Sequence, residues 1–211
     1  MRRIVSVGIG PSPDLLTLRA TRVLREAPVI LTYFGDDVPY PLEEIADINP
    51  RARLMRLGAA FAEGSSAIEE NIRILRSSPE DWGAFLEIGD STLRNPLVHH
   101  VLGGAREFDL EFVPGVSSAS AALSRLGITT KHYCVAGGEE CGLLDHLSSG
   151  PCDLIVLINI GRRDGCPFDL LRSRGYSIKF IRHCCGEGEE ILDHHPGDTY
   201  WVVAVARRGS E

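Results

Sequence analysis

Three short loops hold residue types that could bind a small polar or anionic ligand. They begin at Gly8-Ile9-Gly10-Pro11, at Gly89-Asp90 and at Pro114-Gly115. Glycine lets a backbone approach a ligand closely, and the first amides of a helix that follows a loop attract anions. A carboxylate such as that of Asp90 accepts hydrogen bonds from hydroxyl or amine groups. These loops are therefore candidate binding elements.

Each loop alone is also consistent with a purely structural turn. Asp90 could cap the next helix, and so could the serines after Pro114-Gly115. A short Gly-x-Gly is weak evidence, and Pro13 stands where a dinucleotide-binding fingerprint would have its third glycine. The loops gain weight only from their positions among the predicted strands and helices.

The first part of the chain alternates predicted strands and helices. The candidate loops follow strands over residues 3–8, 82–88 and 110–113. Further strands are predicted over 28–33 and 53–57, an irregular stretch over 35–50, and helices over 14–26 (capped by Asp14), 65–77, 95–103 and 117–126. This alternation is typical of a parallel sheet, whose strands bind ligands at their carboxyl ends. The three loops are expected to share that edge.

The second part of the chain has a different pattern. A helix is predicted between residues 136 and 151, a strand over 153–158, a helix over 168–174, and strands over 177–183, 189–193 and 200–206. The last strands have no helix between them, which favours a hairpin and a mixed sheet. We therefore predict an α/β protein with two domains, residues 1–128 and 129–211.

Composition limits the classes of partner. The chain has 211 residues and a net charge of -7, and the six cysteines are few for that length. The acidic balance argues against nucleic acid or an anionic membrane as the main partner. No secretion signal or membrane span is evident in the sequence. A cytoplasmic protein with six cysteine thiols is the resulting expectation.

Histidines and cysteines form three short clusters: His99-His100, His183-Cys184-Cys185 and His194-His195. None has the spacing of a structural zinc site, and adjacent residues on a strand point to opposite faces. No motif supports Cys184 or Cys185 as a nucleophile. We predict no metal site.

Taken together and in this order, the three loops resemble the tetrapyrrole (corrin/porphyrin) methylase family. The resemblance covers nearly the whole chain. It is carried by Val7 to Pro11 with residues 15–20, by Gly89-Asp90-Ser91, and by Val113 to Ala119 with residues 126–128. It implies a two-domain fold with S-adenosylmethionine in the cleft between the domains, a homodimer, and methyl transfer to a tetrapyrrole.

Family positions carried over to this sequence give a candidate cofactor site. The cofactor-binding residues it implies are Pro11, Ile88, Gly89, Asp90, Leu93, Ser117, Ser118, Ile158 and Asn159. Pro11 is expected at the mouth of the site, and Ile158 and Asn159 on the adenosine side. Asp90 is expected to orient the cofactor, and no catalytic base is assigned.

Substrate carboxylates would suit Arg94, Arg19 and Lys131, since guanidinium and ammonium groups pair with carboxylates. The alternative for each, which local sequence favours, is a solvated surface arginine or lysine. Ser12-Pro13 and Arg94 depart from the family's pattern, which bears on substrate identity and activity.

Within the family, Gly89 to Leu93 and the ending from Tyr200 to Ala206 look like the branch that methylates carbon-20 of precorrin-2 or cobalt-factor-2. The predicted function is therefore a step in cobalamin biosynthesis. Three alternatives remain: another precorrin methylation, a diphthine synthase-like protein methylase, and a non-catalytic member that binds the cofactor or a tetrapyrrole.

Overall fold

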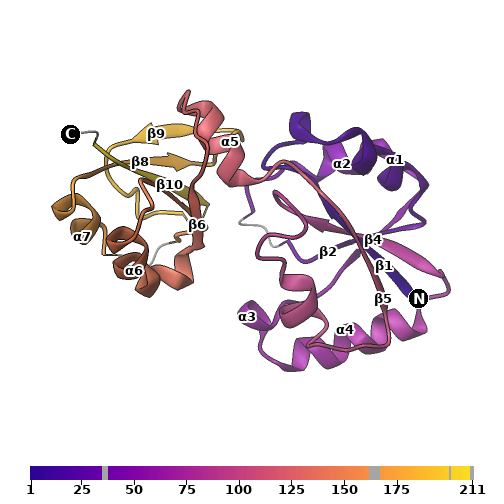
Figure 1. Ribbon diagram of the computed structural model, residues 1–211. Helices are drawn as coiled ribbons and strands as arrows, with labels where there is room; N and C mark the ends of the chain where they lie inside the picture. The colour runs from indigo at the N-terminus through magenta and orange to yellow at the C-terminus, as the bar shows by residue number, and fades with distance from the viewer. Residues whose placement is uncertain (35–37, 162–166, 200, 210–211) are drawn as a thin grey trace. The chain divides into compact units, whose positions relative to one another are not determined.

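The computed structural model describes residues 1–34, 38–161, 167–199 and 201–209 (Figure 1). The chain divides into two compact units, Met1–Ser117 and Ser118–Glu211. This boundary lies earlier than the one predicted after residue 128. Helix α5 (Ser118–Arg125) accounts for the difference, because it packs against strands β7 and β10 of the second unit.

The first unit is built on a parallel sheet of five strands, as predicted. Its strands are β1 (Arg3–Gly8), β2 (Val29–Thr32), β3 (Arg53–Arg56), β4 (Trp82–Glu87) and β5 (Asp109–Val113), in the order β3-β2-β4-β1-β5. Strand β1 lies between β4 and β5 and is parallel to both. The three candidate loops therefore leave adjacent strands at one edge of the sheet.

Helices cover both faces of this sheet, with α1 and α2 on one side and α3 and α4 on the other (Figure 1). The elements are a 3-10 turn (Pro13–Leu15), α1 (Leu18–Glu26), α2 (Leu42–Ile48), α3 (Ala60–Glu63), α4 (Ser66–Ser77) and a π-helical turn (Leu97–Val101). Leu24 packs with Val5 and Val7 on one face, and Leu75 with Ile4 on the other. Burial on both faces explains why the inner strands β1, β2 and β4 are mostly apolar, whereas the edge strands β3 and β5 carry charged residues.

Three local predictions for this unit were wrong. The helix predicted from Asp14 starts only at Leu18, because Thr17 Oγ1 accepts the Ala20 amide at 3.1 Å while the Asp14 carboxylate accepts the Ser12 hydroxyl. The helix predicted over 95–103 is one π-helical turn. Helix α2 lies in a stretch predicted to be irregular, and it forms by burying Ile45 in the core.

The second unit contains the predicted mixed sheet. Its strands are β6 (Cys134–Gly137), β7 (Leu154–Ile158), β8 (Tyr176–Arg182), β9 (Glu190–Leu192) and β10 (Val202–Arg208), in the order β6-β7-β10-β8-β9. Among the strands described in this unit, only β6 and β7 pair in parallel, and β6 was not predicted. A 3-10 segment (Gly138–Leu143), α6 (Leu144–Ser149) and α7 (Phe168–Ser173) complete the unit.

The prediction that all six cysteines are thiols was wrong. Cys134 and Cys152 form a disulfide, whereas thiols were predicted throughout. Their pairing follows from the sheet: β6 lies beside β7, which brings the two Cα atoms to 6.2 Å, within the range that a disulfide spans. Cys184 and Cys185 carry thiols. Cys166 lies outside the described residues.

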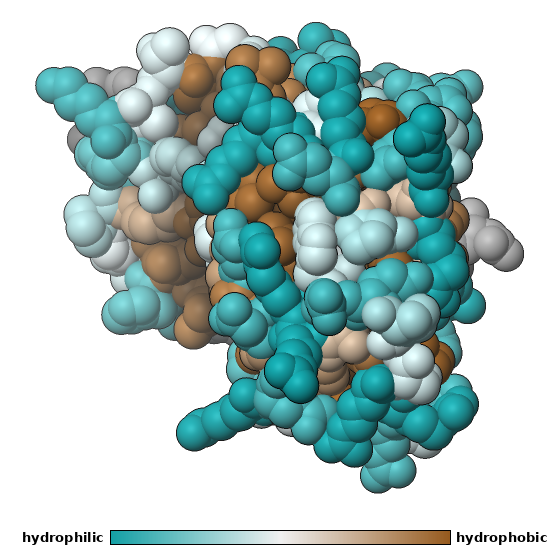
Figure 2. All heavy atoms as spheres, turned by 90° about the vertical axis from the view of Figure 1, so that its right-hand side faces the viewer, coloured by the Kyte–Doolittle hydropathy of each residue, from teal (hydrophilic) through white to brown (hydrophobic). Residues whose placement is uncertain are grey.

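The surface is rich in ion pairs, such as Arg53 with Glu80 and Arg76 with Glu107. The face drawn in Figure 2 mixes hydrophilic side chains with patches of hydrophobic ones. Within the described ranges, no helix has the length and apolar character that crossing a membrane requires.

The start of α1 gives a first prediction. Thr17→Ala removes the acceptor of the Ala20 amide and should lower the free energy of unfolding by about 1 kcal/mol. Urea denaturation of the full chain measures this change. Asp14→Ala is the matched control, because it leaves the Thr17 cap intact. A larger loss for Asp14→Ala than for Thr17→Ala would contradict the assignment of Thr17 as the cap.

Candidate functional site

The loops after β1 and β4 are joined through their backbones. Gly10 and Gly89 exchange two hydrogen bonds, with N–O distances of 3.1 Å and 3.0 Å, and form an isolated antiparallel bridge. The Ile9 amide also donates to the Glu87 carbonyl oxygen at 2.9 Å. Two loops far apart in sequence thus form one rigid backbone surface at the edge of the sheet.

The third loop packs against the other two with no side chain between. A Cβ added to Gly8 would lie 2.6 Å from the Gly115 nitrogen, and one added to Gly115 would lie 2.2 Å from the Gly89 oxygen. Real Cβ atoms essentially never come that close to backbone atoms, so only glycine fits at Gly8 and Gly115. These glycines serve the contact among the loops.

Asp90 fastens the second loop to the third. Its Oδ2 accepts the Gly115 amide at 3.1 Å, and its Oδ1 accepts the Thr92 amide at 2.8 Å and the Thr92 hydroxyl. The hydroxyl of Ser91 is buried and donates to the Val113 carbonyl oxygen at 2.8 Å. The first residue of the next helical turn is Leu97, so Asp90 is not its cap.

Glu87, at the end of β4, is a residue that the sequence prediction missed. Its side chain is buried; Oε1 accepts the Tyr33 hydroxyl at 3.3 Å, and Oε2 has no hydrogen-bond partner among the described residues. Burial raises the pKa of Glu87 well above its usual range, although the Tyr33 hydrogen bond and the charge of Arg94 act in the opposite direction. Glu87, directly before the Gly89-Asp90 loop, therefore holds its proton more tightly than an exposed glutamate does. The sequence did contain a sign of this site, because Glu87 is an acidic residue at the end of an otherwise apolar strand.

The predicted cofactor residues of the first unit lie on the three joined loops. Pro11 is buried, while Ile88, Leu93 and Ser117 are half-buried. Sequence reasoning therefore placed these residues on neighbouring loops, although Pro11 is less open than expected for the mouth of a site.

The remaining predicted cofactor residues belong to the second unit. Ser118 begins α5, and Ile158 ends β7. Asn159 follows with a left-handed φ of 53°, and a Cβ added to Gly138 would lie 2.3 Å from its carbonyl oxygen. The loops after the parallel strands β6 and β7 thus also meet backbone to backbone.

The three basic residues predicted for substrate carboxylates come from different elements. Arg19 lies on α1 and pairs with Glu111 of β5 at 3.5 Å. Arg94 follows the Gly89-Asp90 loop with a φ of 56°. Lys131 is an exposed residue of the second unit. Their role in substrate binding stays a prediction.

Cys184 lacks the character of a nucleophile. Burial, reinforced by the neighbouring Cys185, raises the pKa of the Cys184 thiol. The thiolate is the nucleophilic form, so a raised pKa makes this thiol a poor nucleophile.

The fold and these loops define an α/β protein whose glycine loops gather at the carboxyl edge of a parallel sheet, where such sheets bind ligands. Comparison with known proteins names the class. The family model for Tetrapyrrole (Corrin/Porphyrin) Methylases matches residues 3–211. The chain belongs to this family, which confirms the resemblance found in its sequence.

Two curated relatives have similar sequences. An S-adenosyl-L-methionine-dependent uroporphyrinogen III methyltransferase of Arabidopsis thaliana is 33% identical over 143 residues, which are 62% of this chain and 35% of that protein. A uroporphyrinogen-III C-methyltransferase of Methanobacterium ivanovii is 34% identical over 134 residues, 62% of this chain and 56% of that protein. The matches thus span only a third to just over half of these relatives.

Solved structures share the fold. A cobalt precorrin-4 methyltransferase has a TM-score of 0.75 at 19% identity, with 97% of this chain and 94% of that chain covered. A uroporphyrin-III C-methyltransferase from Thermus thermophilus, complexed with S-adenosylhomocysteine, has a TM-score of 0.67 at 20% identity, with 97% of both chains covered. The predicted two-domain tetrapyrrole methylase fold is confirmed.

The glycine contact gives a second prediction. Gly115→Ala should lower the free energy of unfolding by about 1–3 kcal/mol, because its Cβ would press on the Gly89 carbonyl. Urea denaturation measures the loss. Gly142→Ala is the control, since a Cβ there meets nothing within 4 Å, and it should change stability by less than about 0.5 kcal/mol. Equal stabilities of the two variants would refute the contact.

The buried acid gives a third prediction, on pH. Below the unfolded pKa of about 4.3, Glu87 is neutral in both states. Above it, only the unfolded state releases the proton, so Glu87 destabilises the fold increasingly until the pH reaches its raised folded pKa. The stability of Glu87→Gln relative to the original protein should therefore rise between about pH 5 and pH 7.

Urea denaturation at several pH values measures this trend. Glu107→Gln is the matched control: the hydrogen bond and charge of Arg76 lower the pKa of Glu107, so any trend has the opposite sign. A pH-independent difference between Glu87→Gln and the original protein would show that Glu87 ionises normally.

Proposed function

We propose that this protein transfers a methyl group from S-adenosylmethionine to a carbon atom of a tetrapyrrole. The main structural support is that the loops containing Gly8, Gly89 and Gly115 contact one another at the carboxyl edge of the parallel sheet. Membership of the tetrapyrrole methylase family supports the same reaction. The relatives named as methyltransferases, and the solved neighbour complexed with S-adenosylhomocysteine, support the choice of cofactor.

In this proposal the chain acts chiefly by positioning. The sulfonium methyl of the cofactor is already activated, so the reaction needs an in-line approach of a ring carbon and a dry environment. Backbone groups of residues 88–90 are well suited to hold the methionine part, because Asp90 and the glycine bridge fix their geometry. Asp90 is thus a positioning residue for the loops. No residue is proposed as a base.

Two steps are candidates for the substrate. The sequence from Gly89 to Leu93 favours precorrin-2 or cobalt-factor-2, methylated at carbon-20. The curated relatives favour uroporphyrinogen III as the second candidate. The curated relatives, named as uroporphyrinogen III methyltransferases, give less support to a diphthine synthase-like protein methylase. A homodimer, a cytoplasmic location and the cofactor-binding roles of the predicted site residues in both units stay predictions.

A direct assay gives the fourth prediction. The full chain, incubated with methyl-labelled S-adenosylmethionine, should label precorrin-2 or cobalt-factor-2, with uroporphyrinogen III offered in parallel. Mass spectrometry of the product identifies the methylated macrocycle. If the protein binds the cofactor but labels none of the three macrocycles, the assignment to carbon-20 methylation is refuted. That result would favour the non-catalytic alternative or another precorrin step.

Calorimetry with S-adenosylhomocysteine separates binding from turnover. Asp90→Ala should weaken the affinity about tenfold, or ~1.4 kcal/mol, because the loop loses its bond to the Gly115 amide. Asp109→Ala, at the opposite end of β5, is an exposed control and should bind normally. Unchanged affinity in Asp90→Ala would refute a positioning role.

A further inference from the structure

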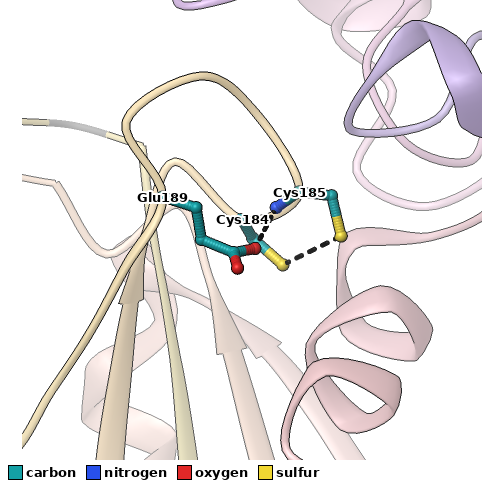
Figure 3. Close-up of side chains that lie close together, drawn as sticks. All are labelled: Cys184, Cys185 and Glu189. Carbon is teal, nitrogen blue, oxygen red and sulfur yellow. Dashed lines mark hydrogen bonds between the residues drawn. The ribbon is translucent and has the colours of Figure 1, made fainter.

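The turn between β8 and β9 holds two thiols and a carboxylate close together (Figure 3). The sulfurs of Cys184 and Cys185 lie 3.9 Å apart. One ligand atom from each of Cys184, Cys185 and Glu189 lies within 4.8 Å of the others. This cluster belongs entirely to the second unit and is independent of the methyl-transfer proposal.

Adjacent side chains on a strand point to opposite faces, which was the reason to predict no metal here. The backbone of the turn removes this objection. His183 and Cys185 adopt left-handed φ angles of 47° and 63°. This conformation is unfavourable for residues other than glycine. The reversal of the chain brings the two neighbouring sulfurs together.

The spacing suits a tetrahedral metal ion. Two thiolates bound to one zinc ion, each at about 2.3 Å, lie about 3.8 Å apart, which matches the observed separation of the sulfurs. Soft thiolate ligands favour zinc and similar ions over magnesium or calcium. Glu189 supplies a carboxylate oxygen, the third ligand type that zinc accepts.

The turn is held in shape before any ion binds. The Gly186 amide donates to the His183 carbonyl oxygen at 2.7 Å, and the Glu189 amide donates to that of Gly186 at 3.2 Å. Glu189 Oε2 accepts the Cys185 amide at 2.5 Å. Cys184 is only 7% exposed, while Cys185 and Glu189 are half-buried.

Arg125 of α5 contacts one of the candidate metal ligands from outside the cluster. Its Nε donates to Glu189 Oε1 at 2.8 Å, which orients the carboxylate as outer partners of metal ligands do. Two thiolates and one carboxylate around a divalent ion carry a net charge of −1. The guanidinium of Arg125 balances that charge.

We propose that residues 184–189 form a binding site for one thiophilic divalent cation of the zinc type, with Cys184, Cys185 and Glu189 as ligands. Each thiol passes its proton to solvent as it binds, and a water molecule fills the fourth position. Because the ligands lie on the hairpin between β8 and β9, the ion fastens this turn. The expected consequence is a melting temperature that rises with the concentration of the metal.

Titration of the full chain with Zn²⁺, under reducing conditions and followed by calorimetry, tests the proposal. One ion should bind per chain. Cys184→Ser/Cys185→Ser should weaken binding by more than about 100-fold, and Glu189→Gln by about 10- to 100-fold. Glu187→Gln, in the same turn, is the matched control and should bind as the original protein does. The double serine variant keeps the other four cysteines, so any binding at those residues would remain.

Absorption spectroscopy with Co²⁺ tests the proposal on the original protein, so it does not depend on whether a variant folds. The original protein should show the charge-transfer absorption of a cobalt–thiolate site and intense visible bands of tetrahedral geometry, and added Zn²⁺ should abolish both. Absence of Zn²⁺ binding by the reduced protein overturns the proposal. Binding of equal affinity in the double serine variant overturns it as well.

Discussion

The close contact of three glycine loops is the constraint on which the first unit depends. Gly8, Gly89 and Gly115 lie so near one another that a single Cβ at Gly8 or Gly115 would collide with backbone. This contact exists because β1 lies between β4 and β5 in a parallel sheet. The strands thus deliver their carboxyl ends to one place, and the absence of side chains there exposes backbone groups that can bind a ligand.

Polar groups at this edge divide into two kinds. The Asp90 carboxylate is satisfied by the amides of Thr92 and Gly115, so it holds the shape of the loops. The Glu87 carboxyl is buried and accepts a hydrogen bond from Tyr33, and burial raises its pKa. One acid therefore orders the three loops, while the other is expected to lower stability as the pH rises.

The second unit uses other means to order its chain. A disulfide joins Cys134 at the start of β6 to Cys152 before β7, and the turn after β8 is held by hydrogen bonds around Glu189. The proposed cation would extend the same principle, because it would link neighbouring residues of one hairpin. Both features lie beside strands of the mixed sheet.

The sequence by itself determined the parallel sheet, the mixed sheet and the family. Apolar strands and glycine turns depend on local chemistry, and the three loop motifs retain their order along the chain. Sequence also placed Gly89 and Asp90 in the candidate site, because both follow a strand directly.

Only the tertiary structure decided which residues meet. Thr17 replaced Asp14 as a helix cap because the Asp14 carboxylate is occupied by Ser12. Helix α5 joined the second unit because its apolar face packs on β7 and β10. The raised pKa of Glu87 depends on burial, the disulfide on the pairing of β6 with β7, and the approach of the Cys184 and Cys185 sulfurs on chain reversal. Local sequence encodes none of these.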